Sequence, residues 1–276
     1  MSPLAAAILG LVEGITEYLP ISSTGHLLVT QRLLGLGGTE QTDLALDTYA
    51  ICIQAGAIAA VLLLYRERIT QMVAGMAGRD DDGRKLLLAT ITAFVPTVAI
   101  ALALQDPVRS RLFGAGPVAF AWIVGGLAIL VLVRTGRLDR VGVEITDITI
   151  RQAALIGVAQ SLALWPGVSR SLTTIVAAVL VGLSLRAAVE FSFLLGLATL
   201  GAATAYEALK NGGNLIDTFG IAAPLIGLVV AFVSAVIAVR WMVAWLETRS
   251  FSVFGWYRIA AGLLVFAGIA TSFGNL

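Results

Sequence analysis

Two glutamates, a serine and a histidine stand close together near the start of the chain. Glu13 and Glu17 are four residues apart, so a helix would place both carboxylates on one face. Ser23 and His26 follow them, and His26 is the only histidine in the 276-residue sequence. Serine, histidine and carboxylate can form an activated nucleophile with its base, and an imidazole exchanges protons near neutral pH. The spacing therefore predicts a nucleophilic site in which His26 assists Ser23.

The two carboxylates also point to a cation. Both lie in an apolar segment, where like charges repel each other and burial of each charge is costly. A divalent cation bound by Glu13 and Glu17, or a proton shared between them, would remove both costs. Two plainer interpretations stay open. The glutamates could form a surface pair on an interfacial helix, and His26 could belong to a structural capping cluster.

A second polar group follows Pro166. It consists of Ser169, Arg170 and Ser171, again within an apolar stretch. A guanidinium at membrane depth needs an anionic partner, and a helix N-terminus with nearby hydroxyls suits a phosphate. The alternative is a structural ion pair between Arg170 and one of the glutamates. Since the phosphate would lie within the bilayer, the sequence predicts a phosphate carried by a lipid.

Both polar groups lie where a proline interrupts an apolar stretch. The stretches are residues 3–34, broken at Pro20, and 150–182, broken at Pro166. Proline ends a helix, and a serine or threonine beyond it can cap a new one. Each half is too short to cross a bilayer, so we predict two re-entrant helical hairpins. Such irregular backbone is tolerated only where protein or water surrounds it.

Composition identifies the environment that these hairpins need. The chain is 58% hydrophobic and 13% charged, with a mean hydropathy of +0.94. These values indicate an all-α polytopic membrane protein and exclude an ordinary soluble domain. The net charge of +1 gives no reason to expect a nucleic-acid partner. Six full spans are predicted, at about 44–65, 86–104, 115–134, 186–207, 218–240 and 254–274.

The order of elements suggests an internal repeat. We predict a single membrane domain, 1–276, with repeat 1 at about 1–140 and repeat 2 at about 150–276. Each repeat holds one hairpin followed by three spans. Because three is odd, the second copy must be inverted across the membrane. Inverted repeats with interrupted helices commonly build a site near the bilayer midplane.

The basic residues predict an orientation. Cytoplasmic loops carry an excess of arginine and lysine. One loop holds Arg66, Arg68, Arg79, Arg84 and Lys85. If this loop is cytoplasmic, most other basic loop residues fall on the same side. Both termini then lie outside, the first hairpin enters from outside, and the active site opens to the extracytoplasmic side.

Two long motifs resemble those of a known family. Residues 13–26 read EGITEYLPISSTGH, and residues 166–174 read PGVSRSLTT. They resemble, in the right order, the signatures E-G-x-T-E-F/Y-L-P-x-S-S-T-G-H and P-G-x-S-R-S-x-x-T of the bacterial undecaprenyl pyrophosphate phosphatases, the bacitracin resistance protein family. Similarity continues through 47–56, 188–195 and Tyr257-Arg258. The chain departs from the family at Leu172, where many members have glycine, and at Ala198, where some have proline.

The resemblance implies hydrolysis of undecaprenyl diphosphate in the bacterial inner membrane, which recycles the lipid carrier of cell-wall synthesis. It implies a divalent cation, Mg²⁺ or Ca²⁺, handled by Glu13 and Glu17, and Ser23 as a nucleophile assisted by His26. Expected partners are the substrate, membrane lipids and a second copy in a homodimer. Arg170 would act in catalysis and hold phosphate, and the other expected substrate-binding residues are Ser22, Thr24, Gly25, Ser169, Ser171 and Thr174.

Two rival hypotheses stay open at this point. In the first, a metal-bound water attacks the diphosphate directly and Ser23 only binds it. In the second, the protein is a polyprenyl-phosphate flippase or transporter, because inverted repeats with broken helices are typical of transporters. A pure transporter has less need of the glutamates, serine and histidine, and the two roles could coexist.

Overall fold

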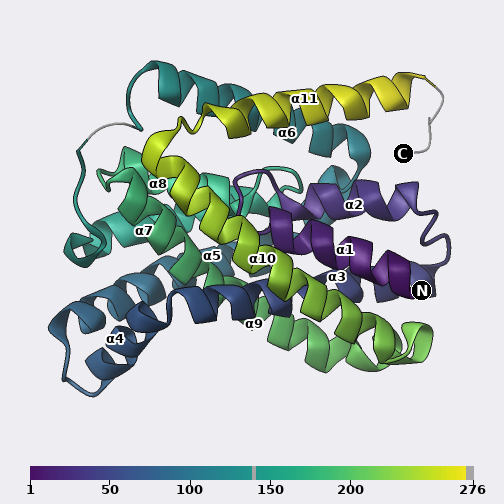
Figure 1. Ribbon diagram of the computed structural model, residues 1–276, viewed down its shortest axis with the longest axis horizontal. Coiled ribbons are helices and arrows are strands. Elements are labelled where there is room, and N and C mark those ends of the chain that lie inside the picture. The colour runs from purple at the N-terminus through teal and green to yellow at the C-terminus, as the bar shows by residue number, and fades with distance from the viewer. Residues whose placement is uncertain (139–140, 272–276) are drawn as a thin grey trace.

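The described part of the chain is helical. The computed structural model describes residues 1–138 and 141–271, apart from the side chains of Gln105 and Arg109. Within these ranges one isolated bridge joins Val143 to Leu183, and no strand is formed. The α-helices are α1 (Pro3–Thr16), α2 (Ser23–Leu33), α3 (Glu40–Leu64), α4 (Arg66–Met76), α5 (Asp81–Leu112), α6 (Ala115–Arg134), α7 (Ile150–Gln160), α8 (Arg170–Leu180), α9 (Leu185–Phe219), α10 (Ala222–Thr248) and α11 (Ser252–Ala270) (Figure 1).

Six of the described helices are long and apolar enough to cross a membrane. They are α3, α5 over Asp81–Leu104, α6, α9, α10 and α11. The prediction of a multi-pass helical membrane protein with six spans is therefore confirmed. The predicted ends were less accurate at α9, which continues past 207 until Gly220 ends it with a φ of 69°. The loop predicted at 66–85 also contains the short helix α4.

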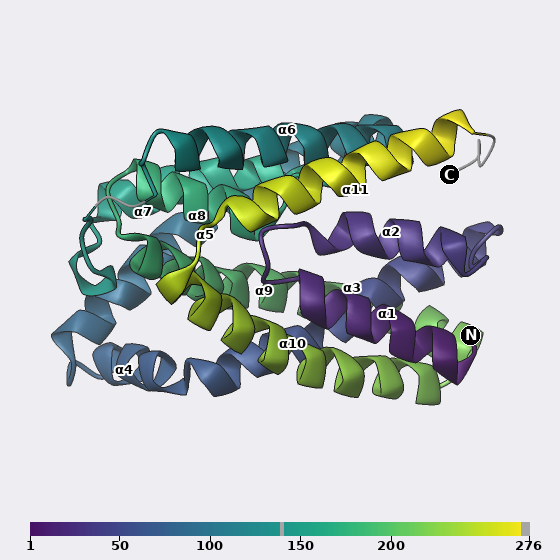
Figure 2. The same ribbon diagram turned by 45° about the horizontal axis from the view of Figure 1, so that its top comes forward.

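Two pairs of shorter helices occupy the interrupted stretches. α1 and α2 run in opposite directions, side by side, and are joined by a break at residues 17–22 (Figure 2). α7 and α8 are joined by the 3₁₀ turn η2 (Ser161–Leu164) and a second break at 165–169. The residue before each second helix, Ser22 or Ser169, has a φ of 74°. Serine rarely adopts this left-handed conformation, so both breaks hold strained backbone.

Close helix contacts carry the two breaks into the interior. α1 packs along α10, and a Cβ at Gly14 would collide with the Ser234 side chain and the backbone of α10. α7 packs along α5, where a Cβ at Gly157 would collide with Ala93. The hydroxyl of Thr97 donates to the Gly157 carbonyl at 2.8 Å. These two glycines let the backbones approach closely enough to hold the broken segments within the bundle.

Arg258 of α11 ties both breaks together. It is fully buried, and none of its hydrogen-bond partners within the described residues is an acidic side chain. Its guanidinium donates instead to backbone carbonyls, at 3.2 Å to Pro20 and 2.8 Å to Gly167, and at 3.0 Å to Ala121 of α6. Hydrogen bonds from a charged donor to carbonyls that lack helical partners are strong, so Arg258 fixes the two breaks relative to each other.

Candidate active site

The two breaks meet and enclose a polar pocket of about 210 Å³. The Ser171 hydroxyl donates to the Leu19 carbonyl across the junction at 2.8 Å. An ion pair between Arg170 and Glu17 spans it at 3.1 Å. The pocket is lined by Glu17, Ser22, Ser23, Thr24, Gln54, Thr97, Gln160, Ala163, Leu164, Trp165, Pro166, Gly167, Ser169, Arg170, Thr199 and Leu200.

Glu17 stands at the centre of the hydrogen bonding. One carboxylate oxygen accepts from the Ser23 hydroxyl at 2.5 Å, and the other accepts from Arg170 Nη2 at 3.1 Å. Both Glu17 and Ser23 are buried, at 6% and 8% exposure. A carboxylate that already accepts the hydroxyl hydrogen is placed to take that proton if the serine attacks. The group in contact with the candidate nucleophile is therefore Glu17.

His26 does not occupy the place that the sequence suggested. Its Nδ1 lies 2.7 Å from the Ser22 carbonyl oxygen, and its Nε2 lies 2.8 Å from the Tyr257 hydroxyl. Both ring nitrogens are thus engaged with partners other than Ser23. The structure therefore shows no direct contact behind the prediction that His26 assists Ser23, and that role stays a prediction. Residues three apart share a helix face, so the direction of the His26 ring follows from its contacts with Ser22 and with Tyr257 of α11 rather than from its position on α2.

Glu13 lies beside this centre on α1. It is 1% exposed. Its carboxyl group interacts electrostatically with the Glu17 carboxyl group and with the Arg170 guanidinium. When both carboxyl groups are ionised, they exceed the one guanidinium in charge, and oxygen donors suit Mg²⁺ or Ca²⁺. Within the described ranges, no three His, Cys, Asp or Glu side chains come together. A magnesium ion is commonly held by one or two carboxylates plus phosphate oxygens, so the pair fits such an ion.

One N–H group of the Arg170 guanidinium has no hydrogen-bond acceptor. Its Nη1 donates to the Ser192 carbonyl at 3.0 Å and its Nη2 to Glu17, while its Nε is buried without a hydrogen-bond partner. The guanidinium carbon lies 5.0 Å from the centre of the Tyr18 ring. A buried charged donor without a partner is uncommon and needs an explanation. An anion in the pocket that Arg170 lines would supply the missing acceptor.

The other predicted binding residues divide into two groups. Ser22, Thr24 and Ser169 line the pocket with Arg170. The rest do not line it: the hydroxyl of Ser171 holds the Leu19 carbonyl, the hydroxyl of Thr174 lies 2.6 Å from that of Ser192, and Gly25 lets α2 approach Trp122 and Val118. These three residues hold neighbouring elements of the pocket together without lining it.

Several pocket residues were not predicted. Gln160 is 3% exposed, donates to the Thr97 hydroxyl at 3.0 Å, and leaves its own carbonyl oxygen without a partner. Gln54, Trp165 and Thr199 complete the lining. A polar residue within an apolar helix is itself a signal of function. That signal was present for Gln54 and Gln160, because both interrupt apolar runs.

A larger hollow of about 590 Å³ adjoins the pocket through Ser23 and Thr24. Its remaining lining is partly polar, with Glu13, Gln31, Asp47, Gln54, Glu207, Lys210 and Asn211, and partly apolar, with Leu27, Leu28, Leu44, Ala50, Ile51 and Phe113. Glu207 accepts hydrogen bonds from Thr48 and Asn211, at 3.0 and 2.6 Å. The hollow therefore connects Ser23 with a space that is lined by both charged and aliphatic groups.

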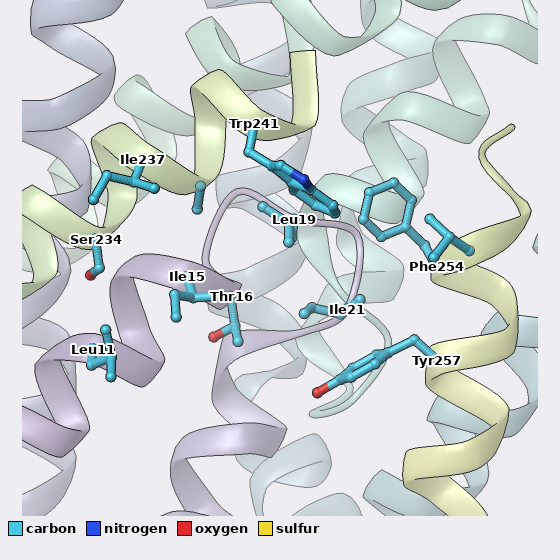
Figure 3. Close-up of a pocket in the computed structure, with 12 residues that line it drawn as sticks. Leu11, Ile15, Thr16, Leu19, Ile21, Ser234, Ile237, Trp241, Phe254 and Tyr257 are labelled. Atoms are coloured by element: carbon cyan, nitrogen blue, oxygen red, sulfur yellow. The ribbon is translucent and has the colours of Figure 1, made fainter. Parts of the chain in front are cut away.

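A separate apolar groove of about 440 Å³ lies on the opposite side of the first break, between α1, α10 and α11 (Figure 3). Leu19 and Ile21 of the break face this groove, whereas Glu17 and Ser22 face the polar pocket. Tyr257 of α11 also lines the groove, and its hydroxyl reaches His26. The first break thus separates an apolar surface from a polar one.

Sequence comparisons find one matching family and several similar proteins. The sequence pattern of the family described as "Bacitracin resistance protein BacA" matches residues 6–264. The chain is 45% identical over 263 residues to "Undecaprenyl-diphosphatase" of Sorangium cellulosum, covering 94% of this chain and 84% of that protein. It is 46% identical over 265 residues to "Undecaprenyl-diphosphatase 2" of Rhodospirillum rubrum (96% and 94% covered). It is also 46% identical over 260 residues to "Undecaprenyl-diphosphatase 1" of Chromobacterium violaceum (94% and 93% covered).

Proposed function

This chain belongs to the bacitracin resistance protein BacA family, and on that premise we propose that it is an undecaprenyl-diphosphate phosphatase. It hydrolyses undecaprenyl diphosphate to undecaprenyl phosphate and inorganic phosphate, and so recycles the lipid carrier of cell-wall synthesis. The names of its relatives and the six apolar helices support this function. The observation that carries it is the buried Glu17 carboxylate between the Ser23 hydroxyl and the Arg170 guanidinium.

The membrane arrangement belongs to the same proposal. α1 and α2, of 14 and 11 residues, span only about 21 and 17 Å, against about 30 Å for the hydrocarbon core. The two broken stretches are therefore re-entrant hairpins of an inverted repeat, 1–140 and 150–276, in one membrane domain. The shared φ of 74° at Ser22 and Ser169 supports the repeat. The protein lies in the bacterial inner membrane with both termini outside and the active site open to the extracytoplasmic side.

Phosphate is held from both breaks. Arg170 offers its unpartnered Nε, and Ser169, Ser22 and Thr24 offer hydroxyls along the same pocket. Ser22 makes no side-chain cap for α2, so the first N–H groups of that helix are left to an anion. A helix N-terminus binds phosphate well because its free N–H groups point along a favourable dipole. The diphosphate thereby lies between a helix end and a guanidinium.

Ser23 then attacks the terminal phosphorus. Its hydroxyl proton passes to Glu17, the new bond joins Ser23 Oγ to phosphorus, and undecaprenyl phosphate leaves with the bridging oxygen. Water next attacks the phosphoserine, returns its phosphate to solution and restores the hydroxyl. Arg170 stabilises the charge on the transferred group, and such electrostatic positioning supplies most catalysis in phosphoryl transfer.

A divalent cation, Mg²⁺ or Ca²⁺, belongs beside these groups. Glu13 and Glu17 would hold it, since their carboxyl groups are adjacent and buried and, when both are ionised, exceed the single guanidinium in charge. When bound, it neutralises negative charge on the diphosphate. The first isoprene units lie along the apolar side of the larger hollow, against Leu27, Leu28 and Ile51. Pairing of two copies as a homodimer stays a prediction.

Phosphate release tests the proposal. Purified protein in detergent is given undecaprenyl diphosphate with and without Mg²⁺ or Ca²⁺, beside an Arg170→Ala variant. We expect cation-dependent release that falls at least about a thousandfold in the variant. Arg84→Ala is the matched control, because Arg84 forms an exposed ion pair with Asp81 outside the pocket.

A negative result has a definite meaning. If folded protein releases no phosphate with any cation, the enzyme is excluded, and a lipid-flipping assay in liposomes tests the transporter instead. If Arg170→Ala keeps the turnover of Arg84→Ala, the phosphatase stands but the guanidinium is not its phosphate clamp.

A further inference from the structure

The ring of His26 is held at both nitrogens, and the two partners together determine the tautomer of the neutral ring. A carbonyl oxygen can only accept a hydrogen bond, so the contact of 2.7 Å with the Ser22 oxygen places a hydrogen on Nδ1. In the neutral ring Nε2 is then the acceptor. The group that faces Nε2 at 2.8 Å is the Tyr257 hydroxyl, which must donate. In the neutral ring, the contacts with Ser22 and Tyr257 together specify the tautomer with hydrogen on Nδ1.

Packing holds this ring from two sides. The Trp122 ring of α6 lies 4.5 Å from that of His26, and the Tyr257 ring lies 5.7 Å away, nearly parallel, at an angle of 16°. Figure 3 shows the Tyr257 ring reaching from α11 along the apolar groove toward the break, with its hydroxyl at the far end. The histidine is thus clamped by α6 and α11, neither of which supplies a residue to the Glu17–Ser23 contact.

The atom that His26 holds belongs to Ser22, one of the two residues of the site with a strained backbone. Ser22 has a φ of 74°, a conformation that costs a non-glycine residue free energy and persists only when neighbours enforce it. Its carbonyl is part of the peptide bond that leads directly into Ser23. The direction of that peptide sets where the Ser23 hydroxyl lies relative to Glu17, now 2.5 Å away.

We propose that Tyr257 is a positioning residue of the reaction: its hydroxyl holds His26 in the Nδ1–H tautomer on the Ser22 carbonyl, which keeps the Ser23 hydroxyl on Glu17. The proposal rests on the phosphatase function and adds a role for α11. His26 then contributes by fixing the nucleophile's backbone, without taking its proton. The second break needs no such clamp, because the Ser169 side chain accepts from the Leu172 N–H and holds that break itself.

Steady-state kinetics give the first test. Tyr257→Phe keeps the ring in the groove and removes only the hydroxyl. We expect kcat to fall roughly tenfold, equivalent to one lost hydrogen bond, with KM changed less than about twofold. Tyr49→Phe is the matched control, since the buried Tyr49 hydroxyl donates to the Ala6 carbonyl and touches no residue of the site. If both variants lose turnover equally, Tyr257 is merely structural and the proposal fails.

Nuclear magnetic resonance of ¹⁵N-histidine gives the second test. Because the chain has one histidine, its two ring nitrogens give unambiguous signals. We expect a protonated Nδ1 and an unprotonated Nε2 in the wild type and in Tyr49→Phe, and a mixture of tautomers in Tyr257→Phe. A wild-type ring with hydrogen on Nε2, or a Tyr257→Phe spectrum equal to that of the wild type, would overturn the proposal.

The two measurements separate this inference from the proposed function. The spectrum requires no turnover, so it reports on the clamp even in an inactive protein. Absence of phosphate release from the wild type counts against the phosphatase, and the positioning role fails with it, whatever the spectrum shows. Normal release with an unaffected Tyr257→Phe variant counts against the clamp alone.

Discussion

The two helix breaks share one backbone conformation but differ in their side-chain hydrogen bonds. Ser22 and Ser169 both precede a helix with a φ of 74°. The Ser169 side chain accepts from the Leu172 N–H at 3.2 Å and lies 3.1 Å from the Ser171 hydroxyl, so the second break caps its own helix. Ser22 forms no side-chain cap. The second break therefore caps its own helix, whereas the helix after the first break starts without a side-chain cap.

Charge separates the breaks as well. Glu13 and Glu17 precede the first break, whereas the neutral Gln160 precedes the second and Arg170 follows it. Opposite charges allow the two segments to meet in the interior through the Glu17–Arg170 ion pair. Breaking a buried pair by removing one partner is costly because it leaves an uncompensated charge. The asymmetry therefore joins the breaks and also gives the pocket its chemistry.

The largest expected effect comes from replacing Ser23 with alanine, compared with the same replacement at Ser171. Ser23→Ala removes the hydroxyl on Glu17 and should lower turnover at least about a thousandfold. Ser171→Ala removes only the hydroxyl on the Leu19 carbonyl, so it should keep most turnover and lose about 1 kcal/mol of stability. Phosphate release and thermal unfolding in detergent measure both.

Ser23 also distinguishes attack by a serine from direct attack by water. Acid quenching during turnover of labelled diphosphate should trap phosphoserine at position 23 and at no other serine. Substantial turnover by Ser23→Ala would favour direct attack by water and would remove the functional difference between the breaks.

A smaller effect is expected when the charges of the two breaks are made more alike. Gln160→Glu adds a carboxylate to the pocket that Arg170 lines. We expect KM for the diphosphate to rise roughly tenfold at low cation concentration, because like charges repel, and to recover in part with excess Mg²⁺. Gln71→Glu, on α4 outside the pocket, is the control. A KM that is unchanged at every cation concentration would show that the neutral amide is not needed.

The smallest effect is expected at Ser22 and Ser169, the residues that precede α2 and α8. Ser169→Ala removes a side-chain cap and one pocket hydroxyl, so it should cost about 1 kcal/mol of unfolding free energy and raise KM a few-fold. Ser22→Ala removes no cap bond, so its stability should stay close to that of the wild type while KM rises a few-fold. Unfolding midpoints and KM values for the two variants test the comparison. Equal losses of stability would mean that both breaks are closed in the same way.

The sequence predicted the ingredients of the site better than their pairing. Arg170 and Glu17 were considered as ion partners from their types alone, and the structure pairs them at 3.1 Å. Ser23 was paired with His26 because the two lie close along the chain, whereas the structure places the Ser23 hydroxyl on Glu17. Ser171 and Thr174 were expected to bind substrate, since a motif identifies a position but not the direction of its side chain. Tyr257 and Gln160 lie far from the motif of residues 13–26, so only the fold could bring them to the site.

What the sequence by itself determined is local. Six apolar runs long enough for a bilayer, two breaks at proline and serine, and a few polar groups beside them all follow from composition and spacing. What only the tertiary structure decided is which of those groups touch: Glu17 with Ser23 and Arg170, and His26 with Tyr257. The physical reason is that hydropathy is set by neighbours along the chain, whereas hydrogen bonds and ion pairs depend on distances of about 3 Å. Such distances are fixed by the packing of helices far apart in sequence.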